Sequence, residues 1–198
     1  MKILGITGGM GSGKTTVANY LKDKGAAVID ADELGREVLK KGTGAFDETK
    51  EAFGQRIFGT DGEINRKKLG DIVFKDKEKL KKLNDITHKF IIEKINLKID
   101  ELKNDKNISM IVIDAAIPVK RGFIDVTDEI WAVITDRESR IQRIMGKSDL
   151  TYYEAVDRID AQPSDSEYTN IADKIITNNE DIYELKIKVA EMLQDISK

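Results

Sequence analysis

A run of glycines near the start of the chain carries the clearest chemical signal in the sequence. Gly8-Gly9-Met10-Gly11-Ser12-Gly13-Lys14-Thr15 fits the pattern G-x-x-x-x-G-K-[ST], which forms a phosphate-binding loop (P-loop) when it joins a strand to a helix. Glycines let the backbone turn its N–H groups inward, so that they form a nest for phosphate oxygens. An apolar run precedes the loop and a helical pattern follows it, which is the context that the motif requires.

Each residue type in the loop suits one part of a nucleoside triphosphate. The start of the following helix adds its positive dipole end to the phosphate site. Lys14 supplies a cation for the β- and γ-phosphates, and the hydroxyl of Thr15 is placed to ligate Mg²⁺. We therefore expect ATP and Mg²⁺ to bind here. The residues concerned are Gly9, Met10, Gly11, Ser12, Gly13, Lys14, Thr15 and Thr16.

Acidic residues follow two of the predicted strands, where ligands bind in open parallel sheets. Asp32 comes after the strand Ala27–Asp30, and we interpret it as the base or orienting group for an acceptor hydroxyl. Asp30 is the alternative, or it caps the next helix. Arg36 lies four residues after Asp32 and so shares its helix face. It would bind a substrate phosphate or pair with that carboxylate.

Asp114 closes the apolar strand that ends with Met110-Ile111-Val112-Ile113-Asp114. This is the position of a Walker B carboxylate, which orders Mg²⁺ directly or through water. A helix N-cap is the alternative role. Asp32 is the other carboxylate that could reach the metal through water. Trp131 lies in an apolar strand and is interpreted as a core residue.

Composition limits the functional classes. The chain has 198 residues, 33 basic and 36 acidic, with a net charge of −3, which gives no bulk attraction for nucleic acid. It has no cysteine and one histidine, His88, which excludes thiolate and multi-histidine metal sites. No signal peptide or membrane span is expected from its apolar runs. We expect a cytoplasmic protein without nucleic-acid or membrane partners, and a monomer with an oligomer as the alternative.

Short Ile- and Val-rich runs alternate with helical patterns, which predicts an α/β fold with a doubly wound parallel sheet. The predicted strands are Lys2–Thr7, Ala27–Asp30, Ile108–Asp114, Glu129–Thr135 and Lys174–Thr177.

About eighty residues between the second and third strands contain no convincing strand. Their patterns predict helices at Ala45–Phe53, Arg66–Phe74, Lys77–Leu83 and Ile86–Leu102. We interpret residues 44–105 as a helical insertion that binds the acceptor, with structural padding as the alternative. The core would then comprise residues 1–43, 106–136 and 166–198.

The segment Arg137–Gln162 predicts two helices joined by a polar turn at residues 146–149, with Thr151 and Glu154 as a capping box for the second. Its cations suit a lid over phosphates, covering residues 137–165, or a solvated basic face. These cations are Arg137, Arg140, Arg143, Lys147 and Arg158.

The chain has no guanine-reading motif, and together with its size and inserted helices this favours phosphoryl transfer to a small acceptor. The motifs of the chain, taken together, resemble those of the dephospho-coenzyme A kinase family, and the resemblance extends along essentially the full length of the chain. The resemblance lies in the ordered set of motifs. These are Gly5–Val17, Asp30-Ala31-Asp32 with Arg36, Asp61–Leu69 with Ile72-Val73-Phe74, Arg143, Ala161-Gln162 and Ala172–Asn178.

This resemblance implies that MgATP phosphorylates the ribose 3′-hydroxyl of dephospho-CoA, with a P-loop core, a helical CoA-binding domain and a lid. Asp32 would accept the hydroxyl proton or orient the oxygen, and Lys14 and Arg143 would stabilise the transferring phosphoryl group. Arg36 would hold the acceptor, and Asn178 would lie near the adenine. His88 and Asp114 join the acceptor-binding candidates, although a lone histidine is more often structural.

The sequence departs from the family pattern at three places. His88-Lys89 replaces His-Pro, Ala115-Ala116-Ile117-Pro118 replaces Pro-Leu-Leu, and Lys147 replaces a lid arginine. The rival interpretations are another P-loop nucleoside or nucleotide kinase and a nucleotide-binding protein that transfers no phosphate.

Overall fold

The computed structural model describes residues 1–116, 123–147 and 150–196. Within it the chain forms two compact units: Met1–Asp30 with Ile99–Lys198, and Ala31–Lys98. The second unit overlaps the insertion that was expected at residues 44–105, but it begins and ends earlier in the chain. Residues 117–118 of the departure after the third strand, and residues 148–149 of the predicted turn, lie outside the described residues. The division into core, acceptor-binding insertion and lid stays a prediction.

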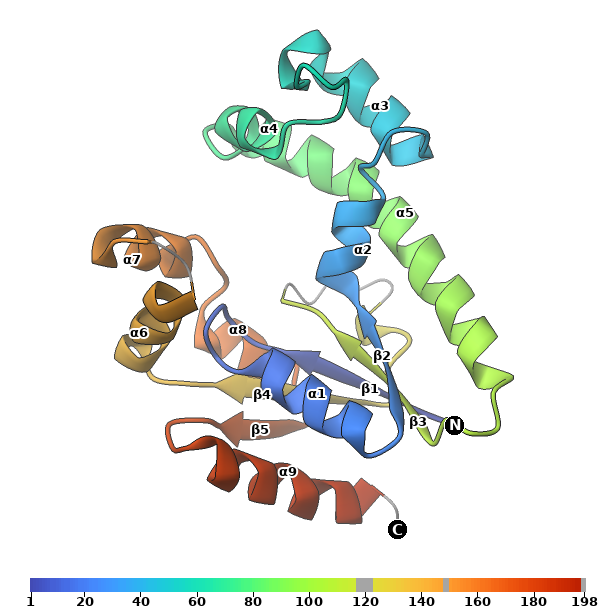
Figure 1. Cartoon of the computed structure of the whole chain (residues 1–198), viewed down its shortest axis with the longest axis vertical. Helices are drawn as coiled ribbons and strands as arrows, with labels where there is room; N and C mark the ends of the chain where they lie inside the picture. The colour runs from blue at the N-terminus through green and yellow to red at the C-terminus, as the bar shows by residue number, and fades with distance from the viewer. Residues whose placement is uncertain (117–122, 148–149, 197–198) are drawn as a thin grey trace. The chain divides into compact units, whose positions relative to one another are not determined.

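A five-stranded parallel sheet organises the first unit, in the order β2-β3-β1-β4-β5. This confirms the expected doubly wound α/β fold (Figure 1). Two strands have the predicted bounds, and the others differ by one or two residues. The strands are β1 (Lys2–Thr7), β2 (Ala26–Asp30), β3 (Met110–Asp114), β4 (Glu129–Ile134) and β5 (Lys174–Thr177).

The described helices of this unit connect the strands and cover the sheet. The capping box of Thr151 and Glu154 is confirmed, and Ser164 and Glu167 form a second one. The prediction that Gly146 and Lys147 belong to a turn is wrong, because α6 continues through Lys147. One glycine is not enough to end a helix whose apolar stripe is packed. These helices are α1 (Lys14–Asp23), α6 (Arg137–Lys147), α7 (Tyr152–Asp160), α8 (Asp165–Thr169) and α9 (Ile182–Ile196).

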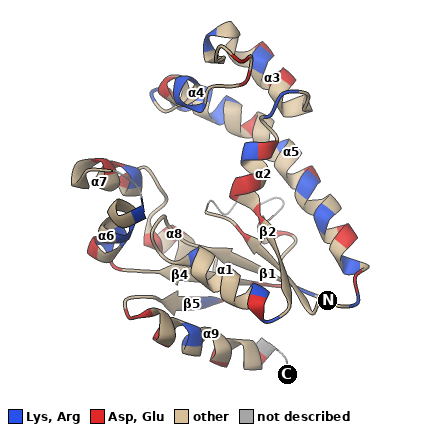
Figure 2. Ribbon diagram, in the orientation of Figure 1, with Lys and Arg blue, Asp and Glu red and all other residues tan. Residues whose placement is uncertain are grey.

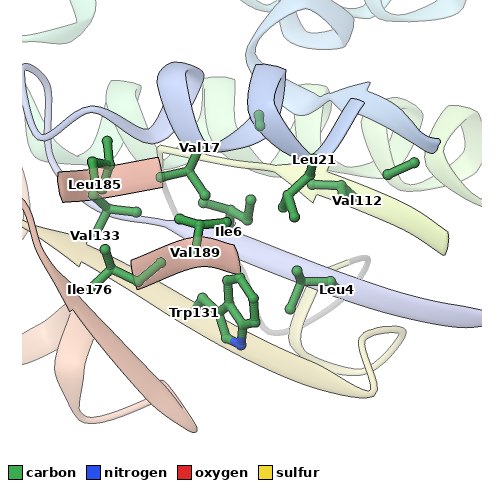
Figure 3. Close-up of a cluster of buried hydrophobic side chains, with 12 residues drawn as sticks. Leu4, Ile6, Val17, Leu21, Val112, Trp131, Val133, Ile176, Leu185 and Val189 are labelled. Atoms are coloured by element: carbon green, nitrogen blue, oxygen red, sulfur yellow. The ribbon is translucent and has the colours of Figure 1, made fainter. Parts of the chain in front are cut away.

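The main core lies between one face of the sheet and helices α1 and α9 (Figure 3). Alternate residues of the strands point to this face, as the two-residue period of a strand requires. Leu4 and Ile6 of β1 are fully buried there against Val17 of α1 and Val189 of α9. Trp131 is fully buried in the same cluster, which confirms its prediction as a core residue.

The opposite face of the sheet is covered as well. Gly5 leaves room there for Phe123, whose ring would lie within 2.8 Å of a Cβ at that position. Tyr168 of α8 is fully buried, and its hydroxyl donates to the carbonyl of Ala116 at 3.0 Å. Both faces of the inner strands are therefore shielded from water, as a parallel sheet requires, whereas Ile175 of the edge strand β5 is 54% exposed.

The second unit is helical and has its own core, made of Phe46, Phe53, Ile57, Ile64, Leu69 and Val73. Its residues outside the helices include an isolated antiparallel bridge between Phe58 and Ile64. Thr43 and Asn65 cap α3 and α4 through their side-chain oxygens. The helices are α2 (Ala31–Glu37), α3 (Gly44–Phe53), the short η1 (Gln55–Ile57), α4 (Arg66–Val73) and α5 (Lys77–Lys103), of which the residues from Ile99 onward belong to the first unit.

The sequence predicted two helices where the structure has the single helix α5 (Lys77–Lys103). The predicted break fell at Asn84 and Asp85, which lower helix propensity by only a few tenths of a kcal/mol each. The span contains neither Gly nor Pro, so nothing interrupts the backbone hydrogen bonds. Lysines and acidic residues are interspersed along it (Figure 2). Among the described residues no helix is both long and apolar enough to cross a bilayer.

Glu129 joins three neighbouring strands at their amino ends. Its carboxylate accepts hydrogen bonds from Lys2 of β1 at 2.8 Å and from the Trp131 indole at 2.7 Å, and it pairs with Lys174 of β5 at 3.3 Å. Burial alone would raise the pKa of Glu129, but the hydrogen bonds from Lys2, Trp131 and Lys174 outweigh burial, and the pKa is lowered. The ionised carboxylate therefore stabilises the fold.

We expect Glu129→Gln to lower the free energy of unfolding near neutral pH by about 1–2 kcal/mol, because charged hydrogen bonds are lost. A folded-state pKa below the unfolded value gives stability that is present above the unfolded pKa and lost as pH falls through the folded pKa. The difference between the variant and the wild type should therefore shrink in acid. Urea unfolding at a series of pH values measures it.

Glu48→Gln is the control, since it removes the exposed pair with Lys89 and should cost no more than about 0.5 kcal/mol. A Glu129→Gln deficit that stays constant down to strongly acidic pH would contradict the role given to its charge.

Candidate active site

The P-loop joins β1 to α1 through three glycines with positive φ. These angles are 140° at Gly8, 78° at Gly11 and 101° at Gly13, a region that other residues rarely adopt. Ser12 N donates to Gly9 O at 3.1 Å and closes the turn. Gly13 provides no side-chain cap for α1, and the first N–H groups of a helix have no partner within it. The loop and helix start are therefore suited to bind an anion.

The glycines are also required by their neighbours. A Cβ on Gly13 would collide with the side-chain amide of Asn178, and a Cβ on Gly9 would collide with the guanidinium of Arg140. At Gly11 the Cβ would lie 2.8 Å from the backbone oxygen of Arg140. Segments from α6 and from the chain after β5 therefore pack directly on the loop.

Donors from these segments hold three consecutive loop carbonyls. Arg140 Nε donates to Met10 O at 3.0 Å, and Arg143 Nη1 donates to Gly11 O at 3.4 Å. Ser12 O accepts from Asn178 Nδ2 at 2.7 Å and lies 2.9 Å from the hydroxyl of Thr135. These carbonyls are satisfied by protein donors, and so they do not compete with a ligand for the N–H groups of the loop. Met10 N and Ser12 N are themselves bonded within the protein, so a phosphate would bind to the other N–H groups.

A pocket of about 350 Å³ lies beside the loop. It combines backbone N–H groups, three cationic side chains and an apolar part from α9, which suits a phosphorylated ligand with an aromatic base. Its lining residues are Gly9, Gly11, Gly13, Lys14, Thr15, Thr16, Arg143, Lys147, Asn178, Glu180, Ile182 and Leu185.

Lys14 and Asp114 meet at this end of the sheet. The Nζ of Lys14 lies 4.0 Å from Oδ1 of Asp114, and both side chains are about nine-tenths buried. In the parallel register Asp114 is paired with Ile6 of β1 and with Asp30 of β2. The carboxyl ends of three strands thus bring two acidic residues and the P-loop lysine to one edge of the sheet.

Hard oxygen ligands for a magnesium ion are present at the same edge. Thr15 is exposed at the start of α1, and Asp114 is buried beside Lys14. Among the described residues no cluster of three or more histidines or carboxylates could hold a metal. One hydroxyl and one carboxylate fit Mg²⁺, which keeps several waters and takes further ligands from substrate phosphates.

Three predicted acceptor-binding residues belong to the second unit. Asp32 and Arg36 are exposed on one face of α2, and Asp32 follows the last residue of β2 by two positions. His88 lies inside α5, where burial lowers its pKa and the nearby Asp85 opposes that change. Asp30 directly precedes α2, at the N-cap position named as its alternative role. The functional roles of these residues stay predictions.

The structure separates the five cations of the segment Arg137–Gln162, of which Arg158 is exposed on α7. Arg143 and Lys147 line the pocket. Arg137 forms a two-pronged pair with Asp160 at 2.6 and 2.9 Å, and this partner raises the pKa of Arg137. Arg140 is buried against the P-loop. Part of this basic segment therefore holds the fold together, and another part faces the pocket.

Sequence reasoning missed several residues that shape the site. Thr135 is fully buried, and its hydroxyl links Ser12 O to Asn178 O. Its place at the end of a predicted strand was the available signal. For Gln162 the available signal was its place in the motif Ala161-Gln162. Glu180, Ile182 and Leu185 carry no local pattern that distinguishes a pocket from a surface helix.

A family model described as dephospho-CoA kinase matches residues 2–184 of the chain. The chain belongs to the dephospho-CoA kinase family. It is 38% identical over 98% of its length to a protein named dephospho-CoA kinase from Carboxydothermus hydrogenoformans, of which it covers 94%. As a member of a kinase family it uses ATP as the phosphoryl donor.

Solved structures agree with this family assignment. The chain is similar to TT1252 from Thermus thermophilus, with a TM-score of 0.80, 27% identity and coverage of 98% of this chain and 97% of the other. Dephospho-CoA kinase from Campylobacter jejuni is similar with a TM-score of 0.70, 26% identity and coverage of 100% and 98%. Each of these matches covers at least 97% of both chains, so the similarity includes residues of both units.

We expect Gly13→Ala to weaken MgATP binding by about tenfold or more. The new side chain would be strained at φ 101° and would displace the amide of Asn178 from Ser12 O, which together cost about 2 kcal/mol or more. Titration calorimetry with MgATP measures the effect. Gly146→Ala is the control, because a Cβ there meets open space in a helix. Equal affinity for both variants would contradict this account of the loop.

Proposed function

We propose that this protein transfers the γ-phosphoryl group of ATP to the ribose 3′-hydroxyl of dephospho-CoA and releases coenzyme A and ADP. The observation that best supports the reaction is the P-loop pocket, in which Lys14 and Arg143 lie beside a loop whose carbonyls are held by the protein. Family membership supports the choice of acceptor.

In this proposal the N–H groups of the loop and of the α1 start hold the β- and γ-phosphates. Lys14 and Arg143 stabilise the negative charge on the transferring phosphoryl group, and this stabilisation is stronger in a partly dry pocket than in water. Arg143 lines the pocket, and its guanidinium is held there by Gly11 O, by the hydroxyl of Thr135 and by Asn178 O. Lys147 adds a cation without the two-pronged geometry of an arginine.

The nucleoside part of ATP would occupy the side of the pocket lined by α9. Ile182 is 59% exposed and lies in the pocket lining with Leu185, so it offers apolar surface to a purine ring. Asn178, proposed near the adenine, has its amide nitrogen committed to Ser12 O. One N–H of this amide thus helps to keep the loop in shape, and the second N–H and Oδ1 would be the groups that face the nucleotide.

Thr15 and Asp114 would hold Mg²⁺ together with the phosphates, with Asp32 as a further ligand through water. When bound, the ion neutralises charge on the phosphate oxygens. Asp114 also keeps Lys14 at the loop, since the two groups pair at 4.0 Å.

Asp32 would orient the 3′-hydroxyl and accept its proton. The hydroxyl oxygen then forms a bond to the γ-phosphorus while the bond to the ADP oxygen breaks. Arg36, on the same face of α2, would bind a phosphate of the acceptor, and His88 and Asp114 would contribute further acceptor contacts. The protein would act as a cytoplasmic monomer on small molecules, without nucleic acid.

A coupled ADP-release assay with MgATP and dephospho-CoA tests the function. Adenosine, AMP and pantothenate serve as control acceptors, and mass spectrometry checks for a product heavier by one phosphate. ADP release that depends on dephospho-CoA alone supports the proposal. Release with a different acceptor would identify another nucleoside or nucleotide kinase. ATP binding without acceptor-dependent release would identify a nucleotide-binding protein.

We expect Asp32→Asn to lower kcat by about a hundredfold or more while ATP affinity is retained, as the loss of a general base predicts. The coupled assay and a MgATP titration measure the two quantities. Asp30→Asn is the matched control, two residues earlier in the chain. Near-normal turnover of Asp32→Asn, or a larger loss in the Asp30 variant, would refute the assignment.

We expect Lys14→Ala to lower kcat/KM for ATP by about a hundredfold or more, because a cation on the transferring phosphoryl group is lost. Lys22→Ala tests the same change on an exposed position of α1 and should leave the rate within about twofold, as surface changes generally do. An unchanged rate for the Lys14 variant would mean that the loop lysine does not contact the phosphates.

A further inference from the structure

Arg140 differs from Arg143 and Lys147 of the same helix, because it is 5% exposed and does not line the pocket beside the loop. Its guanidinium bonds to three separate segments. Nε donates to Met10 O at 3.0 Å, Nη2 donates to the side chain of Gln162 at 3.2 Å, and Nη1 pairs with Asp165 of α8 at 3.2 Å.

Gln162 completes a clamp on one loop residue. Its Oε1 accepts from Met10 N at 2.6 Å and from Arg140 Nη2. Both backbone polar groups of Met10 are therefore fixed, the N–H by Gln162 and the carbonyl by Arg140. Because Met10 lies between Gly9 and Gly11, which have no side chains to hold them, this clamp restrains the most deformable part of the loop.

Arg140 also fills the space beside two glycines of the loop. The three heavy atoms closest to a Cβ on Gly9 all belong to its guanidinium, and those closest to a Cβ on Gly11 belong to its backbone. The first turns of α6 thus rest on the loop. Arg143 lies one turn further along α6, so the position of Arg140 also sets the position of the pocket arginine.

We propose that Arg140 and Gln162 are positioning residues, which clamp the Met10 peptide so that the P-loop holds its phosphate-binding shape and α6 holds Arg143 at the pocket. Neither side chain contacts substrate in this role. The inference rests on the proposed function only in that the loop binds the nucleotide phosphates. It also assigns the start of α6 to the fixed phosphate cradle, although residues 137–165 were expected to form a lid.

Titration calorimetry with MgADP on the full chain tests the clamp. We expect Arg140→Met to weaken MgADP binding by about tenfold or more, while KM for dephospho-CoA at saturating ATP changes by less than about twofold. Arg140→Lys should be intermediate, because one ammonium can reach Met10 O but cannot form the three-way contact. If Arg140 had only a structural role, Arg140→Met would lower the melting temperature but would not weaken MgADP binding more than it changes the KM for dephospho-CoA.

Two Gln162 variants provide a test that does not depend on the folding of an Arg140 variant. Gln162→Met should reproduce the loss of MgADP affinity, and Gln162→Glu should retain it, since a carboxylate accepts the same two hydrogen bonds. Asp165→Asn is the matched control. It removes the half-exposed ion pair on the same guanidinium but not the contacts with Met10, and affinity should stay within about twofold.

A double-mutant cycle joins Gly9 to Arg140. Gly9→Ala should weaken MgADP binding by about tenfold in the wild-type background and by less than about twofold in the Arg140→Ala background, where the colliding guanidinium is absent. Additive effects of Gly9→Ala and Arg140→Ala on MgADP affinity would overturn the clamp. The clamp would also be overturned if Asp165→Asn weakened MgADP binding as much as Arg140→Met does. Wild-type protein that binds no MgADP would instead refute the nucleotide site and the proposed function.

Discussion

A P-loop can offer its N–H groups to phosphate only if its carbonyls find donors elsewhere. In this structure five consecutive carbonyls, from Gly9 to Gly13, each accept a hydrogen bond. Ser12 N serves the first, and Thr16 N serves the last. The three between them depend on side chains that come from distant parts of the chain. The phosphate site is therefore a tertiary structure, although its motif occupies eight residues of sequence.

The parallel sheet brings these donors to the loop. Asn178 follows β5, Thr135 follows β4, and Arg140 and Arg143 lie on the helix that begins directly after β4. All of these segments leave the sheet at the carboxyl ends of the strands, as does β1 before the loop. The opposite end of the same strands carries a purely structural network around Glu129. The carboxyl ends of the strands thus support the phosphate-binding loop, and the amino ends carry contacts that stabilise the fold.

The sequence was sufficient for the parts of the fold that local chemistry determines. The buried β1 is rich in Ile and Leu, and the edge strand β5 carries an Ile-Ile pair, so both were predicted at their observed bounds. The capping box at Thr151 and Glu154 also has a local signature. The break expected in α5 was wrong because weak helix formers such as Asn84 do not stop a helix that lacks Gly and Pro. The family and its kinase activity followed from the order of motifs.

The candidate site was less accessible to sequence reasoning. An arginine on an amphipathic helix has the same pattern whether it faces water, substrate or protein, so nothing local distinguished the buried Arg140 from Arg143 at the pocket. Thr135 and Gln162 act through contacts with residues more than a hundred positions away. The roles of Asp32, Arg36 and His88 in the reaction depend on the bound acceptor and remain predictions.

The contact between Gly9 and Arg140 limits which substitutions the P-loop can accept. The guanidinium occupies the space that any side chain at position 9 would need, so the two positions are not free to drift independently. A side chain at position 9 would push the guanidinium aside, and Arg140 would then give up its contacts with Met10, Gln162 and Asp165. Part of the steric constraint on a glycine in the nucleotide motif therefore originates in a helix that begins more than a hundred residues later.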